Sequence, residues 1–409
     1  MTSYQNIALQ SDLGSTLAHT HIIQSDGEAL QIAHHLAEQF KVNAAHRDAK
    51  RILPFQEIEA YSQSGLWAIS VPKQYGGAEV SSYTLAQVIA IMSGADGSIG
   101  QIPQNHFYAL EVLHNTGSEQ QKNKLYAEVL AGARFGNALA EFKTKNATQK
   151  QTTISKVDNG FEVNGEKFYC TGSLFAHRIP TLVKDQNGRE FLVFIDRNSQ
   201  GVELFDDWSG FGQRTTGSGT VKFNHVQVNA EDIVPFDTAF LEPTLVGPIA
   251  QIMHAAIETG IARAAFEETL TRVRQARPWI DSGVENATDD PLTKLELGRI
   301  IADVRATELL LKQASQSIDL ARPQPTVENI AKASLDVAKV RAHSTETALK
   351  ASSKLIELAG SRGSQRADGL DRFWRNARVH TLHDASRWKY YFIANHLLNG
   401  VLPPRRGTL

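Results

Sequence analysis

The spacing of hydrophobic residues along the chain changes twice. In residues 28–132 apolar side chains recur every three or four positions, as on one face of a helix, for example at Ala29, Ile32, Ala33, Leu36 and Phe40. Residues 133–240 instead contain short apolar runs separated by turn sequences, and residues 241–409 return to long helical patterns. The pattern predicts a helical domain, a β domain and a second helical domain, preceded by a polar arm over residues 1–27.

The first helical region contains one interruption. Residues 67–72 form an apolar run that we expect to be extended and to end in a turn at Gly76 and Gly77. Further along, Ser118 is typical of a helix N-cap and Gly132 of a helix end. This region is therefore predicted to be a helical domain with one ordered loop.

The middle region is predicted to be antiparallel. Strands are expected at residues 152–157, 161–163, 167–170, 191–195, 202–205 and 220–228. The turn sequences between them are Asp158-Asn159-Gly160, Asn164-Gly165 and Gln186-Asn187-Gly188. Asn and Gly tolerate positive φ angles, so repeated hairpins predict an antiparallel barrel or sandwich.

Four long segments follow that are rich in Ala and Leu and mostly free of proline. We expect helices at residues 249–277, 292–320, 327–358 and 369–398. Each is longer than the average helix of about 11–12 residues. Helices of this length and composition are typical of a long antiparallel bundle.

Composition narrows the function classes. The 409 residues carry a formal net charge of -2, from 42 Lys and Arg against 44 Asp and Glu, and 42% of them are hydrophobic. These values indicate a soluble globular protein, and without a basic excess a nucleic-acid partner is not expected. Cys170 is the single cysteine, which excludes an intramolecular disulfide and a thiolate metal site and fits a reducing compartment.

The N-terminal 27 residues are rich in Ser, Thr and Gln. They lack the basic start and the apolar run of a secretory signal. No apolar stretch reaches the roughly 18–20 residues that a bilayer requires. We therefore expect a cytoplasmic protein that does not bind to or cross a membrane.

A glycine-rich loop precedes the last long strand of the middle region. Residues 207–219 contain four glycines, four hydroxyl side chains and Arg214. Such a loop allows backbone N–H groups and hydroxyls to approach a phosphate or a planar polar ligand. A hairpin connection with solvent-facing polar residues is the alternative, because neither Walker nor Rossmann spacing is present.

Other polar side chains stand near the ends of predicted strands. Asn137, Thr171 and Ser173 offer hydrogen-bond donors and acceptors for the edge of a heterocycle. Trp208 offers a surface on which the face of such a ring can stack. Each residue also fits a strand end that enters a turn.

The densest polar cluster lies in the last predicted helix. His380 precedes His383 by three residues and Asp384 by four, so the three side chains are expected on one helical face. A histidine can act as general acid or base, and a carboxylate can orient it. Two alternatives are a metal site, although the Glu of H-E-x-x-H and a third-ligand motif are lacking, and a solvated helix end.

Five motifs follow one another along the chain. They are Tyr75-Gly76-Gly77, Phe135-Gly136-Asn137-Ala138, Tyr169-Cys170-Thr171-Gly172, Gly212-Gln213-Arg214-Thr215 with Val221-Lys222-Phe223, and Arg375-Asn376-Ala377-Arg378-Val379. In this order they resemble the acyl-CoA dehydrogenase superfamily over nearly the whole chain. The resemblance implies an α+β fold with an N-terminal α-helical domain, a middle antiparallel β-barrel and a C-terminal four-helix bundle. It also implies a flavin between barrel and bundle and a homotetramer.

The C-terminal motif indicates a branch of that superfamily. Many acyl-CoA dehydrogenases carry Tyr-Glu-Gly after this helix, with the glutamate as base, whereas the matching residues here are His383-Asp384-Ala385. Residues 375–384 instead resemble the flavin-dependent monooxygenases of sulfur acquisition, of the dibenzothiophene type. The resemblance implies that His383 is the acid/base, and that the flavin and substrate pocket is lined by Asn137, Thr171, Trp208 and His380.

Three further residues complete the expected site. His106 is assigned with Trp208 to the substrate pocket. Arg277 and Arg362 are assigned to the flavin phosphate, within one chain or across a subunit interface, through charge-assisted bonds. An ordinary surface arginine is the alternative for Arg277.

The resemblance implies a two-component monooxygenase that oxygenates a small organosulfur compound with O2. The expected cofactor is FMN, with reduced FMN as cosubstrate, or FAD. Because the chain has no glycine-rich Rossmann unit, a separate NAD(P)H flavin reductase is expected to supply the reduced flavin. The alternatives are an acyl-CoA dehydrogenase that uses FAD with Asp384 as base, and a flavin- or ligand-binding protein without turnover.

Overall fold

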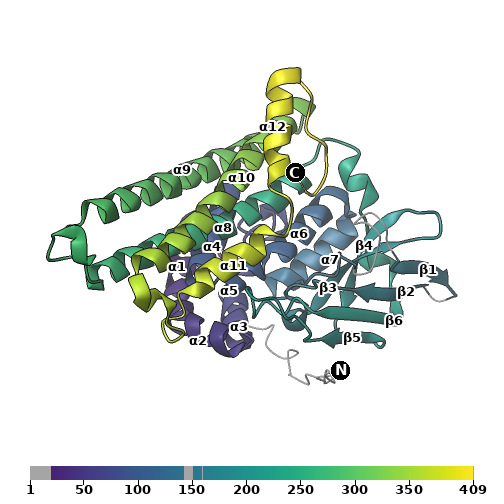
Figure 1. The fold of residues 1–409 in the computed structure, drawn as a ribbon. Coiled ribbons are helices and arrows are strands. Elements are labelled where there is room, and N and C mark those ends of the chain that lie inside the picture. The colour runs from purple at the N-terminus through teal and green to yellow at the C-terminus, as the bar shows by residue number, and fades with distance from the viewer. Residues whose placement is uncertain (1–19, 142–150, 159, 409) are drawn as a thin grey trace.

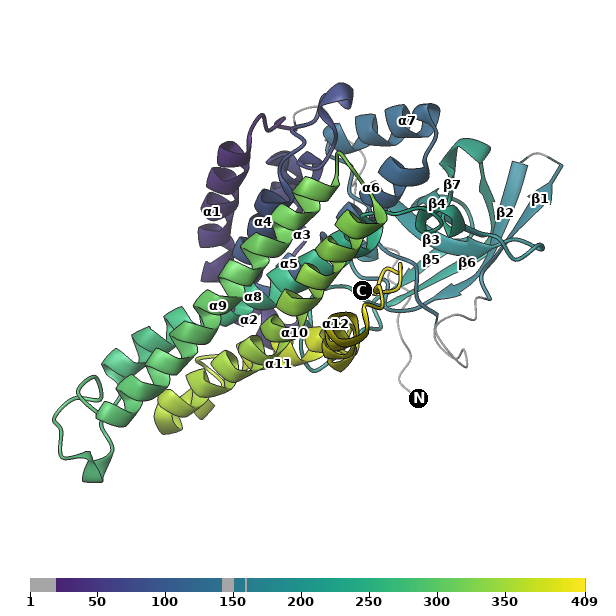
Figure 2. The same ribbon diagram turned by 90° about the horizontal axis from the view of Figure 1, so that it is seen from above.

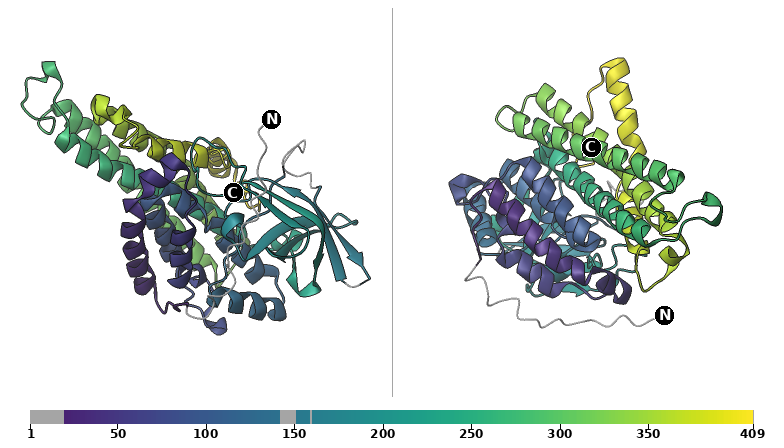
Figure 3. Two further views of the ribbon diagram at one scale, coloured as in Figure 1. Left: turned by 90° about the horizontal axis from the view of Figure 1, so that it is seen from below. Right: turned by 90° about the vertical axis from the view of Figure 1, so that its left-hand side faces the viewer.

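The computed structural model describes residues 20–141, 151–158 and 160–408. A sheet stands at one side of the molecule, and long helices extend away from it (Figure 1). The helices of the first third lie alongside the long helices, as the views in Figure 3 show. The described chain therefore has a helical part at each end of its sequence and a sheet between them.

Seven α-helices form the first third of the described residues. They are α1 (Asp26–Val42), α2 (Ala44–Lys50), α3 (Phe55–Gln63), α4 (Ser82–Ala95), α5 (Gly97–Gln101), α6 (Gln104–Thr116) and α7 (Glu119–Leu130). Helix α4 packs against α1 and against α8 of the last third, so most of its side chains are buried. Ser118 and Gln121 form a capping box at the start of α7, which confirms the predicted helix start.

The apolar run at residues 67–72 is not extended, and that prediction is wrong. A short 3-10 helix, Leu66–Ala68, begins the run, and turns follow it. Trp67 and Ile69 are buried. The run is apolar because it fills the core between helices rather than because it pairs as a strand.

The chain packs on the helices before residue 28. Ile23 is buried, and Thr20 Oγ1 donates to the carbonyl oxygen of Ala131 at 3.0 Å. The end of the predicted polar arm is therefore part of the helical domain. Residues 1–19 of that arm lie outside the described residues.

The middle region forms one seven-stranded sheet in the described part of the chain. Its strands are β1 (Thr153–Val157), β2 (Gly160–Lys167), β3 (Arg178–Lys184), β4 (Glu190–Asp196), β5 (Val202–Phe205), β6 (Thr220–Val228) and β7 (Ile233–Pro235). They lie in the order β5-β6-β2-β1-β3-β4-β7, with β1 and β3 parallel and the other neighbours antiparallel. The sheet is mixed and open at β5 and β7, so the expected closed antiparallel barrel is not confirmed.

Asn164-Gly165 does not form the predicted hairpin. It lies inside β2, whose register with β6 shifts between Val163 and Gly165. Gly165 has a φ of 148°, and a Cβ there would lie 2.6 Å from the Cα of Thr152. The glycine serves a β-bulge and a close backbone approach. Strand β2 continues through the predicted turn as far as Lys167, and residues 168–170 of the next predicted strand are not in a strand.

The turn at residues 186–188 is confirmed. It joins β3 to β4, and Asp185 N donates to the carbonyl oxygen of Arg189 at 3.0 Å. The sequence pattern predicts no strand at β3, because Pro180 interrupts it. Asn159, in the first predicted turn, lies outside the described residues.

Three long helices dominate the last third: α8 (Val246–Gln275), α9 (Pro291–Ala321) and α10 (Val327–Leu358). They agree closely with three of the predicted helices and run side by side in Figure 2. Asp290 caps α9 by accepting from the N–H groups of Leu292 and Thr293. Helix α10 packs against α8 and α9 and against both later helices.

The fourth predicted helix is broken. Helix α11 spans Asp371–Thr381 and α12 spans Arg387–Asn399, with a non-helical linker between them. Figure 1 shows α12 running in a different direction from α11. The four-helix bundle is therefore not confirmed. His383 and Asp384 lie in the linker, so they do not share a helical face with His380, which corrects that prediction.

One hydrophobic core joins the first and last helical parts and reaches β3 and β4 through Leu182 and Phe194. A second, smaller core lies on the sheet and contains Val163, Cys170 and Ile179. None of the helices in the described residues is both long and apolar enough to cross a membrane.

Candidate active site

Helix α11 holds the glycine-rich loop, residues 207–219, against the helical part. Gln213 N donates to Oδ1 of Asn376 at 2.7 Å. A Cβ on Gly212 would lie 1.9 Å from the carbonyl oxygen of Arg375. Only glycine allows the backbones of loop and helix to approach this closely.

Arg375 ties the same helical turn to α2. Its Nη1 donates to Asp48 Oδ1 at 3.1 Å and to the carbonyl oxygen of Phe211 at 3.0 Å, and its Nε donates to Asp371 at 2.7 Å. Burial acts to lower the pKa of Arg375, but the hydrogen bonds to Asp48 and Asp371 prevail and raise it. The Arg-Asn motif thus fixes the loop in place.

Thr171 stands at one end of a chain of hydroxyl groups. Its Oγ1 lies 2.7 Å from Ser218 Oγ, which lies 2.7 Å from Thr216 Oγ1. Thr216 Oγ1 donates to the carbonyl oxygen of Gln213 at 3.0 Å. Because each hydroxyl has one hydrogen, Ser218 must donate to Thr216 and Thr171 to Ser218. The Thr171 oxygen is therefore left as an acceptor for a ligand N–H group.

Asn137 offers a second acceptor. Ser173 Oγ accepts from Asn137 N at 3.0 Å and donates to its carbonyl oxygen at 2.8 Å, so Ser173 fixes the Asn137 backbone. Asn137 Nδ2 donates to the carbonyl oxygen of Tyr169 at 3.0 Å. Its Oδ1 is buried and has no hydrogen-bond partner among the described residues. Such an unpaired atom costs about 1–3 kcal/mol, so a ligand donor is expected there.

Trp208 lies beside these two groups. Its Nε1 donates to the carbonyl oxygen of Gln213 at 2.8 Å, and its ring centroid lies 6.0 Å from that of Tyr169. Tyr169 is 47% exposed and has a φ of 58°, a conformation that non-glycine residues adopt rarely and often at functional sites. The structure thus gathers four of the candidate ligands in one region: Asn137, Thr171, Ser173 and Trp208.

His106 lies elsewhere, in the hydrophobic core. Burial lowers the pKa of His106 to about 3, so the ring is neutral. Its Nε2 donates to the carbonyl oxygen of Trp67 at 2.7 Å, and its Nδ1 accepts from Phe135 N at 3.1 Å. With both nitrogens bonded to backbone groups, His106 is a core residue, which corrects its assignment to the substrate pocket.

Arg277 and Arg362 are also separate from the loop. Both are exposed, Arg277 after the end of α8 and Arg362 in the turn after α10. These connections lie where the long helices point away from the sheet (Figure 1). The stretch of α8 from Glu258 to Gln275 alone spans about 25 Å at ~1.5 Å per residue. Within one chain the two arginines therefore do not join the other candidate ligands.

A buried carboxylate on α8, Glu258, organises the histidines. Its Oε1 accepts from Arg341 Nη1 at 2.5 Å and lies 2.9 Å from Nδ1 of His380. Its Oε2 accepts from the hydroxyls of Ser344 at 2.8 Å and Thr345 at 2.9 Å. Burial acts to raise the pKa of Glu258, but the Arg341 guanidinium and the other donors lower it overall, so the carboxylate is ionised.

Three imidazoles follow this carboxylate. His380 Nε2 lies 3.0 Å from Nδ1 of His254, and the rings of His254 and His383 lie 4.0 Å apart between centroids. His254 and His380 are buried, whereas His383 is exposed to solvent. Desolvation by the surrounding protein lowers the pKa of His383 to about 4, although water still reaches the ring and moderates the effect. Neither ring nitrogen of His383 has a hydrogen-bond partner among the described residues.

Asp384 is held by two cations. Its Oδ1 lies 3.4 Å from Arg341 Nη2 and its Oδ2 lies 3.5 Å from Lys389 Nζ. Burial acts to raise the pKa of Asp384, but Arg341 and Lys389 lower it overall. Lys389 also donates to the carbonyl oxygen of Thr408, which brings the C-terminal segment against this group. Asp384 is therefore an ion-pair partner and a weak base.

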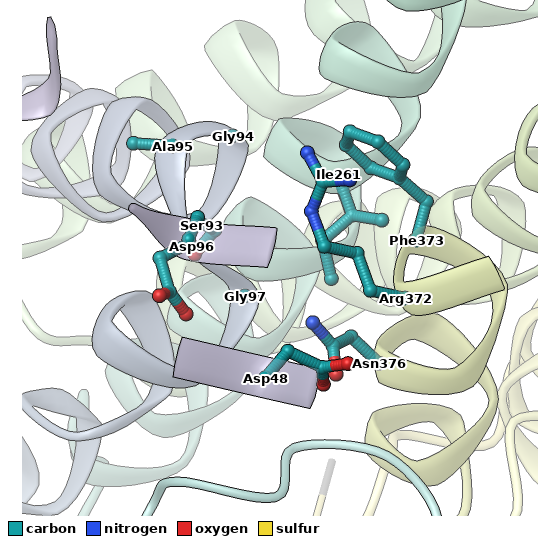
Figure 4. A pocket seen from close by; sticks show the side chains of 11 residues that line it. Asp48, Ser93, Gly94, Ala95, Asp96, Gly97, Ile261, Arg372, Phe373 and Asn376 are labelled. Carbon is teal, nitrogen blue, oxygen red and sulfur yellow. The ribbon is translucent and has the colours of Figure 1, made fainter. Parts of the chain in front are cut away.

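A small pocket borders α11 on another side (Figure 4). It is lined by Asp48, Arg372, Phe373, Asn376, Ile261, Ala44 and residues 93–97. It includes none of the histidines or candidate cofactor ligands, so we do not place the reaction there. In the described ranges, no three His, Cys, Asp or Glu side chains are grouped to hold a metal ion.

Comparisons with known proteins agree with this architecture. The acyl-CoA dehydrogenase N-terminal domain matches residues 30–133, and the acyl-CoA dehydrogenase C-terminal domain matches residues 252–388. Dibenzothiophene monooxygenase of Rhodococcus qingshengii is 30% identical over 396 residues, which cover 93% of this chain and 95% of that protein. The chain belongs to the acyl-CoA dehydrogenase family. Its fold is that of the family, with helical N- and C-terminal domains and a central mixed sheet.

Two further relatives lie in the monooxygenase branch of the family. A probable FMNH2-dependent monooxygenase of Pseudomonas putida is 27% identical over 388 residues, 92% of this chain and 96% of that protein. The solved structure of TdsC from Paenibacillus sp. A11-2 with FMN and indole has a TM-score of 0.87 at 30% identity. The aligned region covers 93% of this chain and 100% of the TdsC chain. The expected resemblance to dibenzothiophene-type monooxygenases is confirmed.

Three residues of this site, Glu258, His254 and Arg341, are not predicted from the sequence. A signal for the first two was present, since a histidine and a glutamate four residues apart are the only titratable side chains in the mostly apolar run of residues 246–262. Polar groups on a buried helix face require partners. Arg341 had no comparable signal, because α10 carries many charged residues.

Proposed function

We propose that this chain is a flavin-dependent monooxygenase that transfers one oxygen atom of O2 to a small organosulfur compound and releases the other as water. The observation that carries the proposal is the contrast between His383 and Asp384. His383 is an exposed imidazole whose nitrogens have no partner among the described residues, whereas two cations hold Asp384. The dibenzothiophene and FMNH2-dependent monooxygenases among its relatives support the same chemistry.

The acyl-CoA dehydrogenase alternative requires Asp384 to remove a proton from the substrate. Arg341 and Lys389 hold Asp384 in ion pairs that engage both of its carboxylate oxygens, so neither oxygen is free to remove a proton. Its side chain is also one methylene shorter than the glutamate it would replace, and a misplacement of about 1 Å can cost about 10²-fold in rate. Both facts argue against the dehydrogenase reaction.

The residues around the glycine-rich loop fit a flavin. Reduced FMN, when bound, supplies the two electrons that reduce O2. Thr171 Oγ1 and the unpaired Asn137 Oδ1 are both acceptors, and a reduced isoalloxazine carries more ring N–H groups than an oxidised one. These acceptors therefore favour the reduced cofactor. Trp208 and Tyr169 offer aromatic surfaces for its ring system.

His383 is the proposed acid/base. Its lowered pKa keeps the ring neutral near pH 7 and makes its protonated form a strong proton donor, so in this proposal the ring relays a proton from solvent to the oxygen atom that leaves as water. His380 is buried and contacts Glu258 and His254 rather than solvent. We therefore assign the proton transfer to His383 alone.

In this proposal a separate NAD(P)H flavin reductase supplies the reduced FMN, and the chain assembles as a homotetramer. The positions of Arg277 and Arg362 support an oligomer. Both are exposed, and the helix ends that carry them point away from the loop of their own chain. If Arg277 and Arg362 bind the flavin phosphate, a second copy of the chain must bring them to it.

The test is His383→Ala, assayed with FMN, a flavin reductase and NADH against dibenzothiophene and a small alkylsulfinate. We expect product formation to fall by about 10²-fold or more, with FMN binding unchanged in a fluorescence titration. His225→Ala, which removes an exposed histidine on β6, is the matched control. Wild-type product formation by the His383 variant would refute the role, and anaerobic bleaching of bound flavin by an acyl-CoA would support the dehydrogenase instead.

A further inference from the structure

The buried network behind His383 has a definite direction of hydrogen bonding. We infer that Glu258, acting through His380 and His254, is a positioning residue for His383: it draws the first proton taken up by the three imidazoles to His380 and leaves His383 neutral. The role of His383 in turnover rests on the proposed function. The protonation order of the histidines does not, and it can be tested without turnover.

The hydrogen bonds of Glu258 decide the state of His380. An ionised carboxylate only accepts, so the contact at 2.9 Å requires a hydrogen on Nδ1 of His380. Arg341, Ser344 and Thr345 donate to the remaining lone pairs of Glu258. The carboxylate is thus held in one orientation and cannot turn away from His380.

His380 then decides the state of His254. When His380 is neutral, its Nε2 is an acceptor, and the contact at 3.0 Å requires a hydrogen on Nδ1 of His254. When His380 gains a proton, its Nε2 donates and Nδ1 of His254 accepts. In both states His254 can remain neutral. Two cationic rings in contact would repel each other inside a buried site.

His383 contacts the last member of this chain by its ring face. The centroids of His254 and His383 lie 4.0 Å apart with their planes tilted by 40°, and no hydrogen bond joins the two rings. The chain therefore does not conduct a proton to His383. It acts by fixing where positive charge resides next to His383.

The charged groups around His383 come from four elements. Glu258 and His254 lie on α8, Arg341 on α10, His380 on α11 and Lys389 on α12, and Asp384 is its neighbour in the linker. Two cations face two carboxylates, so the group is neutral when all three imidazoles are neutral. Only His380 has a hydrogen bond to a carboxylate, so the first added proton goes there. A cation on His380 in turn lowers the pKa of His383.

Removal of the Glu258 charge should therefore make His383 easier to protonate. In Glu258→Gln the amide oxygen can still accept from His380, but nothing stabilises a cation on that ring. The first proton then goes to His383, the imidazole that solvent reaches. The acid limb of any process that needs neutral His383 is expected to move to higher pH.

The experiment measures the rate at which diethyl pyrocarbonate modifies His383 as a function of pH, by peptide mass spectrometry on the full chain. This reagent reacts with the neutral imidazole of a histidine and not with its protonated form. Glu258→Gln should shift the half-maximal rate to higher pH. The matched control is Asp336→Asn, which neutralises another buried carboxylate, on α10, that is paired with Lys332 and Lys339 and should leave the profile unchanged.

Two outcomes would overturn the inference: a Glu258→Gln profile that overlays the wild type, or an equal shift in Asp336→Asn. If Glu258→Gln folds poorly by its thermal melt, His380→Phe is the second variant. It removes the ring that takes up the first proton, so the half-maximal rate for His383 should again shift to higher pH, and an unchanged profile would also overturn the inference. If the shift is found but no organosulfur compound is oxygenated, the proposed function fails while the protonation order stands.

Discussion

The Arg341–Glu258 ion pair gives a sharp test of how the last third of the chain is held together. Both side chains are fully buried, and Arg341 also donates to Thr345 at 2.8 Å and contacts Asp384 at 3.4 Å. Arg341→Met keeps an unbranched apolar stem but leaves Glu258 as a buried carboxylate without its guanidinium. Removal of one partner of a buried pair typically costs about 3–5 kcal/mol.

This magnitude can be converted to a melting temperature. The unfolding entropy is about 2.1 cal/mol/K per residue, so a chain of 409 residues that unfolds as one unit has an unfolding entropy of about 0.9 kcal/mol/K. The expected loss is then about 3–6 °C in Tm. Arg299→Met removes an exposed pair with Glu296 and should cost about 1 °C or less.

The loss should also depend on pH. In the wild type Arg341 helps to lower the pKa of His380, so its removal raises that pKa in the folded state. A higher pKa of His380 in the folded variant stabilises the variant relative to the wild type at low pH. This relative stabilisation is lost as pH rises through the folded-state pKa of His380. The Tm difference between Arg341→Met and the wild type should be smaller at about pH 6 than at about pH 8. Equal losses in the Arg341 and Arg299 variants, or a difference independent of pH, would refute the reasoning.

Two other predictions concern the loop and the single cysteine. Gly212→Ala should weaken FMN binding and cost about 1–3 kcal/mol in thermal melts, because its Cβ meets the Arg375 carbonyl oxygen. Gly298→Ala on α9, whose Cβ meets nothing within 4 Å, should stabilise by about 0.5–1 kcal/mol, and the reverse order would contradict the geometry. Burial raises the pKa of the Cys170 thiol, so iodoacetamide should modify it only after denaturation, as followed by mass spectrometry; rapid labelling of the folded protein would show that the thiol is accessible.

Local patterns predicted most of the helices but only part of the sheet. The helices α8, α9 and α10 follow from long apolar periodicity, and Asp290 marks a start that the sequence makes visible. The pairing of β2 with β6 has no such local signature, so the sequence predicts a turn at Asn164-Gly165 where the structure has a bulge. The closed barrel is not confirmed, and local patterns could not decide it, since sheet closure depends on which strands meet at the edges.

The candidate site divides in the same way. The sequence singles out Asn137, Thr171, Ser173 and Trp208 as polar or aromatic side chains near strand ends, and the structure brings them together in one region, while their binding of a flavin stays a prediction. The relation among the histidines could not be predicted, because it depends on where α11 ends. Leu382 is the C-cap of α11 and is 65% exposed, and no glycine or proline in residues 381–386 marks this helix end in the sequence.

In the proposed reaction, the separation of His383 from His380 gives the two rings different roles. Had the helix continued, both rings would lie on one face and compete for the same environment. Because the helix ends, His380 reaches Glu258 across 122 residues of sequence while His383 remains open to solvent. The buried ring can hold a positive charge beside an ionised carboxylate, and the exposed ring can stay neutral and exchange protons. This division arises only when α8, α10 and α11 are packed together, because Glu258, Arg341 and His380 come from three different helices.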